Sequence, residues 1–258
     1  MSHPAYGTLR PVSPVASVLL QRNPSTMTLE GTNTWVLSAP GARGRIVVDP
    51  GHALDDHLSL LAEFGDVELV VLTHHHPDHA EAAPLLAERA GVPVRALDPA
   101  LCQGADPIED GEELRAAGLG LHVTHTPGHT ADSVVLRLSH GDRDYVLTGD
   151  TVLGRGTTVV SDLGSYLDSL RVLSALPPAV LGLPGHGPEL PDVARAAQDY
   201  LRHREGRLDQ VREALRRLGD DATARQVVEL VYADVDRALW VPAEQSVRAQ
   251  LEYLRARG

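Results

Sequence analysis

The sequence predicts an α+β fold that ends in a small helical module. In residues 15–48, short apolar runs are separated by Pro and Gly turns, a pattern typical of antiparallel strands. From Asp55 onward, helical and strand patterns alternate, which indicates parallel strands with helices outside the sheet. Residues 199–258 show helical spacing alone. We therefore expect a sheet-based domain at residues 1–198 and a helical module at residues 199–258.

The first part of the chain predicts strands that precede any helix. Residues 1–14 contain three prolines and no periodicity, so we expect a loose arm there, and they lack the basic head and apolar run of a signal peptide. A strand is predicted at Val15–Leu20, and partial alternation continues over Met27–Leu37. Pro40-Gly41 forms a turn before a short strand at Arg45–Val48. These segments favour an antiparallel start to the sheet.

Helices and strands alternate in the middle of the chain. A first helix after Asp55 is stopped by Gly65, and a buried strand follows at Val67–Leu72. A second helix covers Glu81–Ala90 and leads to a short strand at Val94–Ala96, whereas residues 98–113 are acidic and loop-like. The remaining elements of this domain are strands at Leu119–Thr124, Ser133–Leu138, Asp144–Leu147 and Val180–Leu183, and a helix at 165–176. This order predicts at least locally parallel pairing.

The C-terminal module reads as three helices. A long helix begins near Pro191, and a capping box from Thr223 to Gln226 opens a second helix. A third helix is predicted after Pro242. Three helices fit a winged-helix-like shape, although no hairpin is predicted that would form a wing.

Composition limits the class of protein and its partners. The chain has 258 residues, one cysteine (Cys102) and no lysine, and its formal net charge is -12. A single cysteine excludes an intrachain disulfide and a cysteine-based zinc site, and it is typical of a reducing compartment, so we expect a cytoplasmic protein. The acidic charge argues against strong general binding of nucleic acids. No run approaches the roughly eighteen apolar residues of a membrane-spanning helix, so no membrane partner is expected.

A dense cluster of metal-binding side chains follows the predicted strand at Val67–Leu72. This stretch reads Thr73-His74-His75-His76-Pro77-Asp78-His79. Imidazole and carboxylate groups are the usual protein ligands of zinc. Three further turns at strand ends carry His129, Asp150 and His186. Because loops at one end of a sheet system can converge, we expect these side chains to form one site.

The predicted ligands divide into two sets with a bridge. One ion is assigned to His74, His76 and His129, and the second to Asp78, His79 and His186. Asp150 has two carboxylate oxygens and can bridge both ions, whereas His75 alternates away from its neighbours and is not expected to be a ligand. Two divalent ions lower the pKa of a shared water toward about 7. The site therefore predicts a hydrolase that uses a metal-bridging hydroxide, with Asp78 handling a proton.

These motifs are similar to those of a known superfamily. The stretch 73–79 matches the T-H-x-H-x-D-H signature of the metallo-β-lactamase superfamily, and His129, Asp150 and His186 match its remaining metal motifs. The resemblance implies a four-layer αββα sandwich with a dinuclear zinc site at one edge of the sheets. Two zinc ions per chain are expected on this basis, with iron or manganese as alternatives.

A closer resemblance extends over nearly the whole chain. Residues 22–34, the segment 162–170, Pro-Gly-His-Gly-Pro at 184–188 and His203-Arg204 look like the β-lactamase-like-protein-2 group. In that group the C-terminal domain is described as winged-helix-like, and the mammalian member is an endoribonuclease that prefers single strands. Related fungal proteins are thioesterases. True β-lactamases lack an aspartate at the position of Asp150, so the resemblance argues against antibiotic hydrolysis.

The sequence leaves three classes of function open. The first is a zinc-dependent hydrolase of a phosphodiester such as single-stranded RNA, or of a small-molecule thioester or ester. The second is an iron-dependent persulfide dioxygenase, because such enzymes share the fold and the motifs and use one metal site. The third is a metal-binding module without catalytic activity. The complete ligand set favours the first class.

Overall fold

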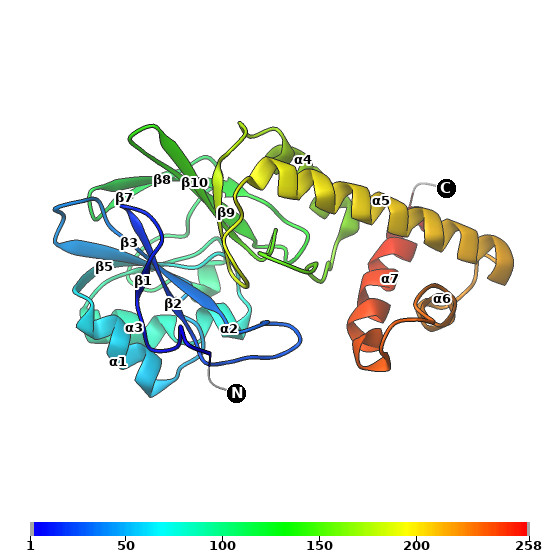
Figure 1. Ribbon diagram of the computed structural model, residues 1–258, viewed down its shortest axis with the longest axis horizontal. Coiled ribbons are helices and arrows are strands. Elements are labelled where there is room, and N and C mark those ends of the chain that lie inside the picture. Colours follow the sequence, from blue (N-terminus) through cyan, green and yellow to red (C-terminus); the bar gives the residue numbers. More distant parts are fainter. Residues whose placement is uncertain (1–2, 257–258) are drawn as a thin grey trace.

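The structure, a computed structural model that describes residues 3–256, is a four-layer αββα sandwich with a helical module beside it (Figure 1). Two sheets pack face to face, and helices cover the outer face of each. The predicted α+β class and the layered arrangement are both confirmed. No helix in residues 3–256 is long and apolar enough to cross a membrane.

The first sheet contains six strands in chain order. They are β1 (Arg10–Pro11), β2 (Ala16–Leu20), β3 (Asn33–Leu37), β4 (Gly44–Val48), β5 (Asp66–Val71) and β6 (Val94–Arg95). Pairing is antiparallel up to β4 and parallel from β4 to β6. The antiparallel start and the parallel continuation follow the sequence pattern, because helices connect the later strands.

The second sheet contains five strands. They are β7 (Glu113–Ala116), β8 (Leu119–His125), β9 (Val134–His140), β10 (Arg143–Gly149) and β11 (Leu181–Pro184), in the spatial order β11-β10-β9-β8-β7. All neighbours pair antiparallel except β10 and β11, which are parallel. Parallel pairing brings the C-terminal ends of β10 and β11 to the same edge, where Asp150 and His186 follow.

Alternating side chains build the layers. Ile46 and Val48 of β4 pack between the two sheets with Leu136 of β9, whereas Val47 of the same strand faces the helical layer with Leu58. That layer consists of α1 (Asp55–Glu63) and α3 (Ala83–Ala90), with the short α2 (Pro77–Ala80) and the 3-10 helix η1 (Pro99–Leu101) at its ends. On the other side, α4 (Leu163–Ser174) covers the second sheet.

The C-terminal module consists of helices. They are α5 (Val193–Leu218), α6 (Ala224–Val231), the 3-10 helix η2 (Arg237–Leu239) and α7 (Trp240–Arg255). The module has its own cluster of buried side chains, among them Val211, Val227 and Trp240. Helix α5 runs without a break through residue 198, where the sequence places the domain boundary, and its first part packs on α4. Among the described residues of 199–256 there is no strand.

Several predicted boundaries differ from the structure for local reasons. Residues 113–116, where the predicted loop 98–113 ends and no strand was predicted, form β7 because they pair with β8. The segment 27–32 is a turn region, and the strand begins at Asn33. The helix predicted at 81–90 is α3, which begins at Ala83, and the separate short helix α2 precedes the predicted range. Helix α7 begins at Trp240, whereas the sequence analysis places its start after position 242.

Candidate metal centre

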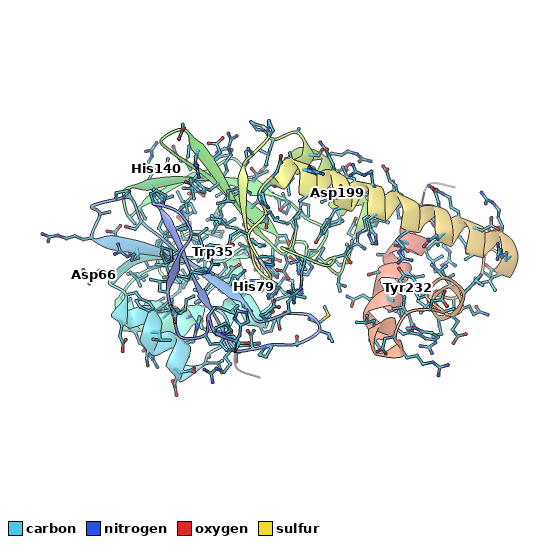
Figure 2. The ribbon with its side chains drawn as sticks, in the orientation of Figure 1. Trp35, Asp66, His79, His140, Asp199 and Tyr232 are labelled. Atoms are coloured by element: carbon cyan, nitrogen blue, oxygen red, sulfur yellow. The ribbon has the colours of Figure 1, made fainter. Side chains whose placement is uncertain are left out.

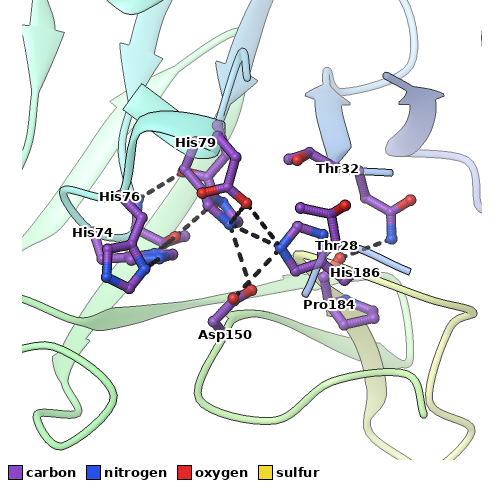
Figure 3. Close-up of polar contacts among 12 residues, drawn as sticks. Thr28, Thr32, His74, His76, His79, Asp150, Pro184 and His186 are labelled. Atoms are coloured by element: carbon purple, nitrogen blue, oxygen red, sulfur yellow. Dashed lines mark hydrogen bonds and ion pairs between the residues drawn. The ribbon is translucent and has the colours of Figure 1, made fainter. Parts of the chain in front are cut away.

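The seven predicted ligands lie on segments that follow strands at one edge of the sandwich. Figure 3 labels five of them, His74, His76, His79, Asp150 and His186. His74 and His76 follow β5, and Asp78 and His79 lie on α2. His129 lies after β8, Asp150 after β10 and His186 after β11. Pro77 at the first position of α2 turns the chain directly after His76, so that both halves of the 73–79 stretch face the same space.

The first group of side chains contains His74, His76 and His129, whose nearest ring nitrogens lie within 4.8 Å of one another. His76 Nδ1 lies 3.2 Å from His74 Nε2 and 3.0 Å from His129 Nε2. His76 Nδ1 carries at most one proton, so it cannot donate a hydrogen bond to both of these neighbouring nitrogens. Ring nitrogens that converge in this way suit a shared cation.

The second group contains Asp78, His79 and His186, with ligand atoms again within 4.8 Å of one another. His186 Nε2 lies 3.2 Å from His79 Nε2 and 3.2 Å from an oxygen of Asp78. His79 and His186 are buried, whereas the Asp78 side chain is 20% exposed. This group therefore has one carboxylate that a ligand in solvent can reach.

Asp150 lies between the two groups. Its Oδ2 is 3.7 Å from His129 Nε2 in the first group and 3.4 Å from His186 Nε2 in the second, and its Oδ1 is 3.5 Å from His79 Nε2. Figure 3 shows this carboxylate pointing toward His79 and His186. The Oδ1 atom is buried and accepts no hydrogen bond from the described residues. A buried carboxylate oxygen without a donor is costly, and a cation would satisfy it, so the residues present fit two divalent ions.

Burial keeps the first group neutral. It lowers the pKa of His74 well below its ordinary value and also lowers the pKa of His129. Burial, together with the charge of His129, lowers the pKa of His76 to about 4. Neutral imidazole is the form that binds metal, so these three rings are ready for an ion at neutral pH.

The carboxylates dominate the second group. Burial lowers the pKa of His186, but the charges of Asp150 and Asp78 outweigh it and raise that pKa to about 10. Asp150 and Asp49 likewise raise the pKa of His79 against the effect of burial. Burial favours the neutral form of Asp78, yet the hydrogen bond with His186 and the charge of His79 lower its pKa to about 2. The protonated imidazoles of this group therefore offset the negative charge of the carboxylates. A bound metal ion would replace those protons.

Fixed partners orient the imidazoles from behind. His129 Nδ1 lies 2.7 Å from the carbonyl oxygen of Val159, and His186 Nδ1 lies 3.1 Å from that of Gly31. Because each carbonyl can only accept, the Nδ1–H donates and Nε2 is free to face the site. Each ring is thus held with its ligand nitrogen toward the centre.

Asp49, directly after β4, contacts the candidate centre, and the sequence analysis did not single it out. Its carboxylate accepts hydrogen bonds from the Thr73 backbone N–H at 2.8 Å and from the Thr73 hydroxyl at 2.7 Å. It also lies 2.9 Å from His79 Nδ1. The available signal was its position directly after a predicted strand, which it shares with the site carboxylate Asp150.

Gly185 leaves the space that this packing needs. A Cβ atom there would lie 2.5 Å from Asp150 Oδ1 and 2.7 Å from His79 Cε1. Any side chain at position 185 would displace the bridging carboxylate or a ring of the second group. The glycine between Pro184 and His186 is therefore required by the site itself.

Other candidate residues lie outside the two groups. His75 Nδ1 is 2.6 Å from Asp132 Oδ1, and the His75 side chain is about half exposed. Cys102 makes long hydrogen bonds to the carbonyl oxygens of Ala96 and Asp98. The structure does not bring either side chain to the ligands.

A cavity of about 370 Å³ adjoins the centre. His129 and Asp150 line it, together with residues of α5, of the segment 232–239 and of α7. The volume falls within the range of small-molecule pockets. The C-terminal module thus forms part of the wall beside the metal ligands.

A family model described as the metallo-beta-lactamase superfamily matches residues 27–186, which include all seven predicted ligands. The chain belongs to the metallo-beta-lactamase superfamily. A second model, described as the beta-lactamase associated winged helix domain, matches residues 223–258.

Relatives of this superfamily member are similar over most of its length. It is 33% identical to a "Beta-lactamase-like protein 2 homolog" of Drosophila melanogaster, over 93% of this chain and 87% of the relative. A "Lactamase-like protein nscB" of Trichophyton equinum is 34% identical over 83% of this chain, which spans 65% of that relative. The crystal structure of a beta-lactamase domain protein from Burkholderia ambifaria shares the fold, with a TM-score of 0.85 and 22% identity over 100% of this chain and 90% of the other.

Proposed function

We propose that this superfamily member is a dinuclear zinc-dependent hydrolase. Its substrate class is a phosphodiester of the RNA type, or a thioester or ester, and not a β-lactam. The observation that carries the proposal is the position of Asp150, whose two oxygens lie 3.4–3.7 Å from imidazole nitrogens of both ligand groups. A carboxylate in that position can join two ions in a single centre.

The chain's own residues have distinct roles in this proposal. When bound, two divalent ions lower the pKa of a shared water and polarise an oxygen of the substrate. His74, His76 and His129 would hold one ion, and Asp78, His79 and His186 would hold the other. Asp78 combines a partly exposed side chain with a pKa lowered to about 2, so it is ionised and within reach of substrate. It can therefore accept a proton from the nucleophile or pass one to the leaving group.

A parallel assay tests this proposal directly. The zinc-loaded protein is offered single-stranded RNA, a bis-aryl phosphodiester and an acyl thioester, and hydrolysis of at least one is expected. Asp78→Ala should lower kcat/KM for that substrate by a factor of about 100 or more, because it removes both a ligand and the proton acceptor. The rate is measured under saturating zinc.

The matched control is His122→Ala, which removes an exposed histidine of β8 outside the centre. It should retain wild-type turnover, and circular dichroism should show that both variants fold. Wild-type rates in Asp78→Ala would refute the role of that residue. Absence of turnover on every substrate, with two zinc ions bound, would favour a metal-binding module without catalytic activity.

A second candidate is an iron-dependent oxidoreductase of the persulfide dioxygenase type. It is favoured by a third set of converging atoms, from His74, His79 and Asp150, which lie within 4.8 Å of one another. Two histidines and one carboxylate are the ligands typical of non-haem iron oxygenases. Metal analysis distinguishes the two, since one iron per chain with oxygen uptake on a persulfide would replace the hydrolase proposal.

A further inference from the structure

The cavity beside the centre is bounded by both parts of the molecule. From His129 and Asp150 it extends along the segment 153–159 to helix α5 and to the residues between Tyr232 and Ser246. Figure 2 shows Tyr232 in the module that lies beside the sandwich, where His79 is labelled. A substrate held in this cavity would place its reacting bond at the ligands and its remaining atoms against the module.

The charge of the cavity is opposite to that of the whole chain. The formal net charge of the protein is -12. Yet the described residues lining the cavity include the basic side chains Arg155, His203, Arg204 and Arg207, and their acidic member, Asp150, belongs to the candidate metal centre. Arg155 is paired with Glu30 at 2.5 Å, which leaves the residues of α5 as the basic groups available to a ligand.

Arg204 is a buried cation with an incomplete set of partners. Its side chain belongs to a residue that is 4% exposed, and one guanidinium nitrogen donates to the carbonyl oxygen of Thr158. The guanidinium carbon lies 5.4 Å from the centre of the Tyr166 ring. Its Nε atom is buried without a hydrogen-bond partner, and no described carboxylate lies within ion-pair distance. A buried charge in this state is costly, and an anion in the cavity would neutralise it.

Arg207 lies one helical turn further along the same face of α5. Its guanidinium carbon is 4.6 Å from the centre of the Tyr232 ring, and Nη1 donates to the Gln210 side chain at 2.8 Å. Tyr232 thus fixes the guanidinium at the wall of the cavity without neutralising it. Arg204 and Arg207 together offer two oriented cations to one ligand.

The remaining lining is largely apolar and includes Leu29, Leu153, Val159, Val235 and Leu239. A ligand that contacts both the metal-binding side chains and the two arginines therefore also needs apolar surface to pack against this lining.

We infer that the cavity takes a small ester or thioester that carries an anionic group, a carboxylate or a phosphate, which Arg204 and Arg207 bind. This inference rests on the proposed hydrolase function and assigns the substrate class of the same site. An RNA chain needs an open groove with cations spaced along its backbone. A cavity of about 370 Å³ with a largely apolar lining suits a small molecule instead.

The test compares thioesters that differ in charge alone. In the first pair, the acyl chain of the charged thioester ends in a carboxylate, and that of the neutral thioester ends in the methyl ester of this carboxylate. In the second pair, the thiol part of the charged thioester carries a phosphate, and that of the neutral thioester does not. For the wild type, kcat/KM of one charged thioester should exceed that of its neutral partner by about tenfold or more, mainly through KM. The pair that shows the preference identifies the anion as carboxylate or phosphate.

Arg207→Gln should reduce this preference about tenfold, because it removes the charge from a partly exposed side chain of the cavity wall, and circular dichroism should show that the variant folds. The matched control is Arg212→Gln, on the same helix but outside the cavity and paired with Asp209 at 2.7 Å. It should keep the wild-type preference. Equal turnover of charged and neutral thioesters, or a preference that survives Arg207→Gln, would overturn the inference and leave the hydrolase proposal standing.

A binding measurement separates the two proposals if no thioester is hydrolysed. Calorimetry on the zinc-loaded protein compares uncleavable thioether analogues of the same pairs. Tighter binding of a charged analogue, lost in Arg207→Gln, would support the cavity assignment although the hydrolase proposal fails. Equal binding of charged and neutral analogues would overturn it. If the protein cleaves single-stranded RNA in a way that depends on Arg207 and does not hydrolyse thioesters, the inference is overturned and the substrate class is RNA.

Discussion

Asp49 acts on the candidate metal centre without being one of its ligands. Its carboxylate accepts two hydrogen bonds from Thr73 and lies 2.9 Å from His79 Nδ1. Thr73 directly precedes His74, and its hydroxyl lies 3.0 Å from His74 Nδ1. One buried carboxylate therefore orients a ring from each of the two ligand groups.

Asp49→Asn tests this role at the scale of one residue. The amide keeps the size of the side chain but removes its charge and one acceptor, so both rings lose part of their support. Zinc affinity should fall by about 10–100-fold, the usual effect of removing a group that orients a ligand. Competition with a chelator of known affinity measures it.

Asp144→Asn is the matched control, since Asp144 pairs with Arg137 on the surface of the second sheet. It should leave zinc affinity unchanged. If Asp49→Asn also bound zinc as tightly as the wild type, the structure's orientation of His79 would not depend on this carboxylate.

At the scale of elements, helix α5 fixes the segment that supports His129. The Tyr200 hydroxyl accepts from the Leu153 N–H at 3.1 Å and donates to the Gly156 carbonyl oxygen at 2.9 Å. Arg204 donates to the Thr158 carbonyl oxygen, and the Thr158 hydroxyl lies 2.9 Å from His129 Nδ1. The first part of α5 is thus tied to the centre through residues 153–158.

Tyr200→Phe should loosen this connection. It leaves the Leu153 N–H and the Gly156 carbonyl without their partner, so the free energy of unfolding should fall by about 1–3 kcal/mol. Chemical denaturation measures the loss, and kcat on the best substrate should fall with it because His129 is less firmly held. An unchanged unfolding free energy would show that α5 does not stabilise the segment.

Elements next to the site could be predicted because their signals are local. The buried apolar run that ends at Leu72 indicates where the strand ends. The proline at the start of α2 marks the turn that carries the histidines. The strand β7 could not be predicted in the same way. Its residues Glu113–Ala116 have one buried leucine, and the strand forms because β8 supplies its hydrogen bonds.

At the scale of the molecule, α5 belongs to both parts of the chain. It packs on α4 of the sandwich and on α6 and α7 of the module, and it passes through residue 198 without interruption. We propose that residues 1–198 and 199–258 are two units that share this helix. The shared helix keeps the module at the mouth of the metal centre, which is what gives the cavity its second wall.

The cavity could not be predicted from the sequence. Its walls come from residues near 26–29, 153–159, 203–207 and 232–246, which are far apart along the chain. The convergence of the candidate ligands could be predicted, because each lies on a segment that directly follows a predicted strand. Asp49 falls between these cases, since an aspartate after a strand is also an ordinary turn residue until Thr73 and His79 are seen to contact it.

The central claim is that Asp150 joins two ions in one centre, and the zinc content of the protein tests it most directly. The purified chain is loaded with zinc, dialysed and analysed for metal per chain, beside Asp150→Ala. The account predicts two zinc ions per wild-type chain and the loss of at least one in the variant, because the bridging oxygens are gone. One ion per wild-type chain, or two in Asp150→Ala, would contradict it.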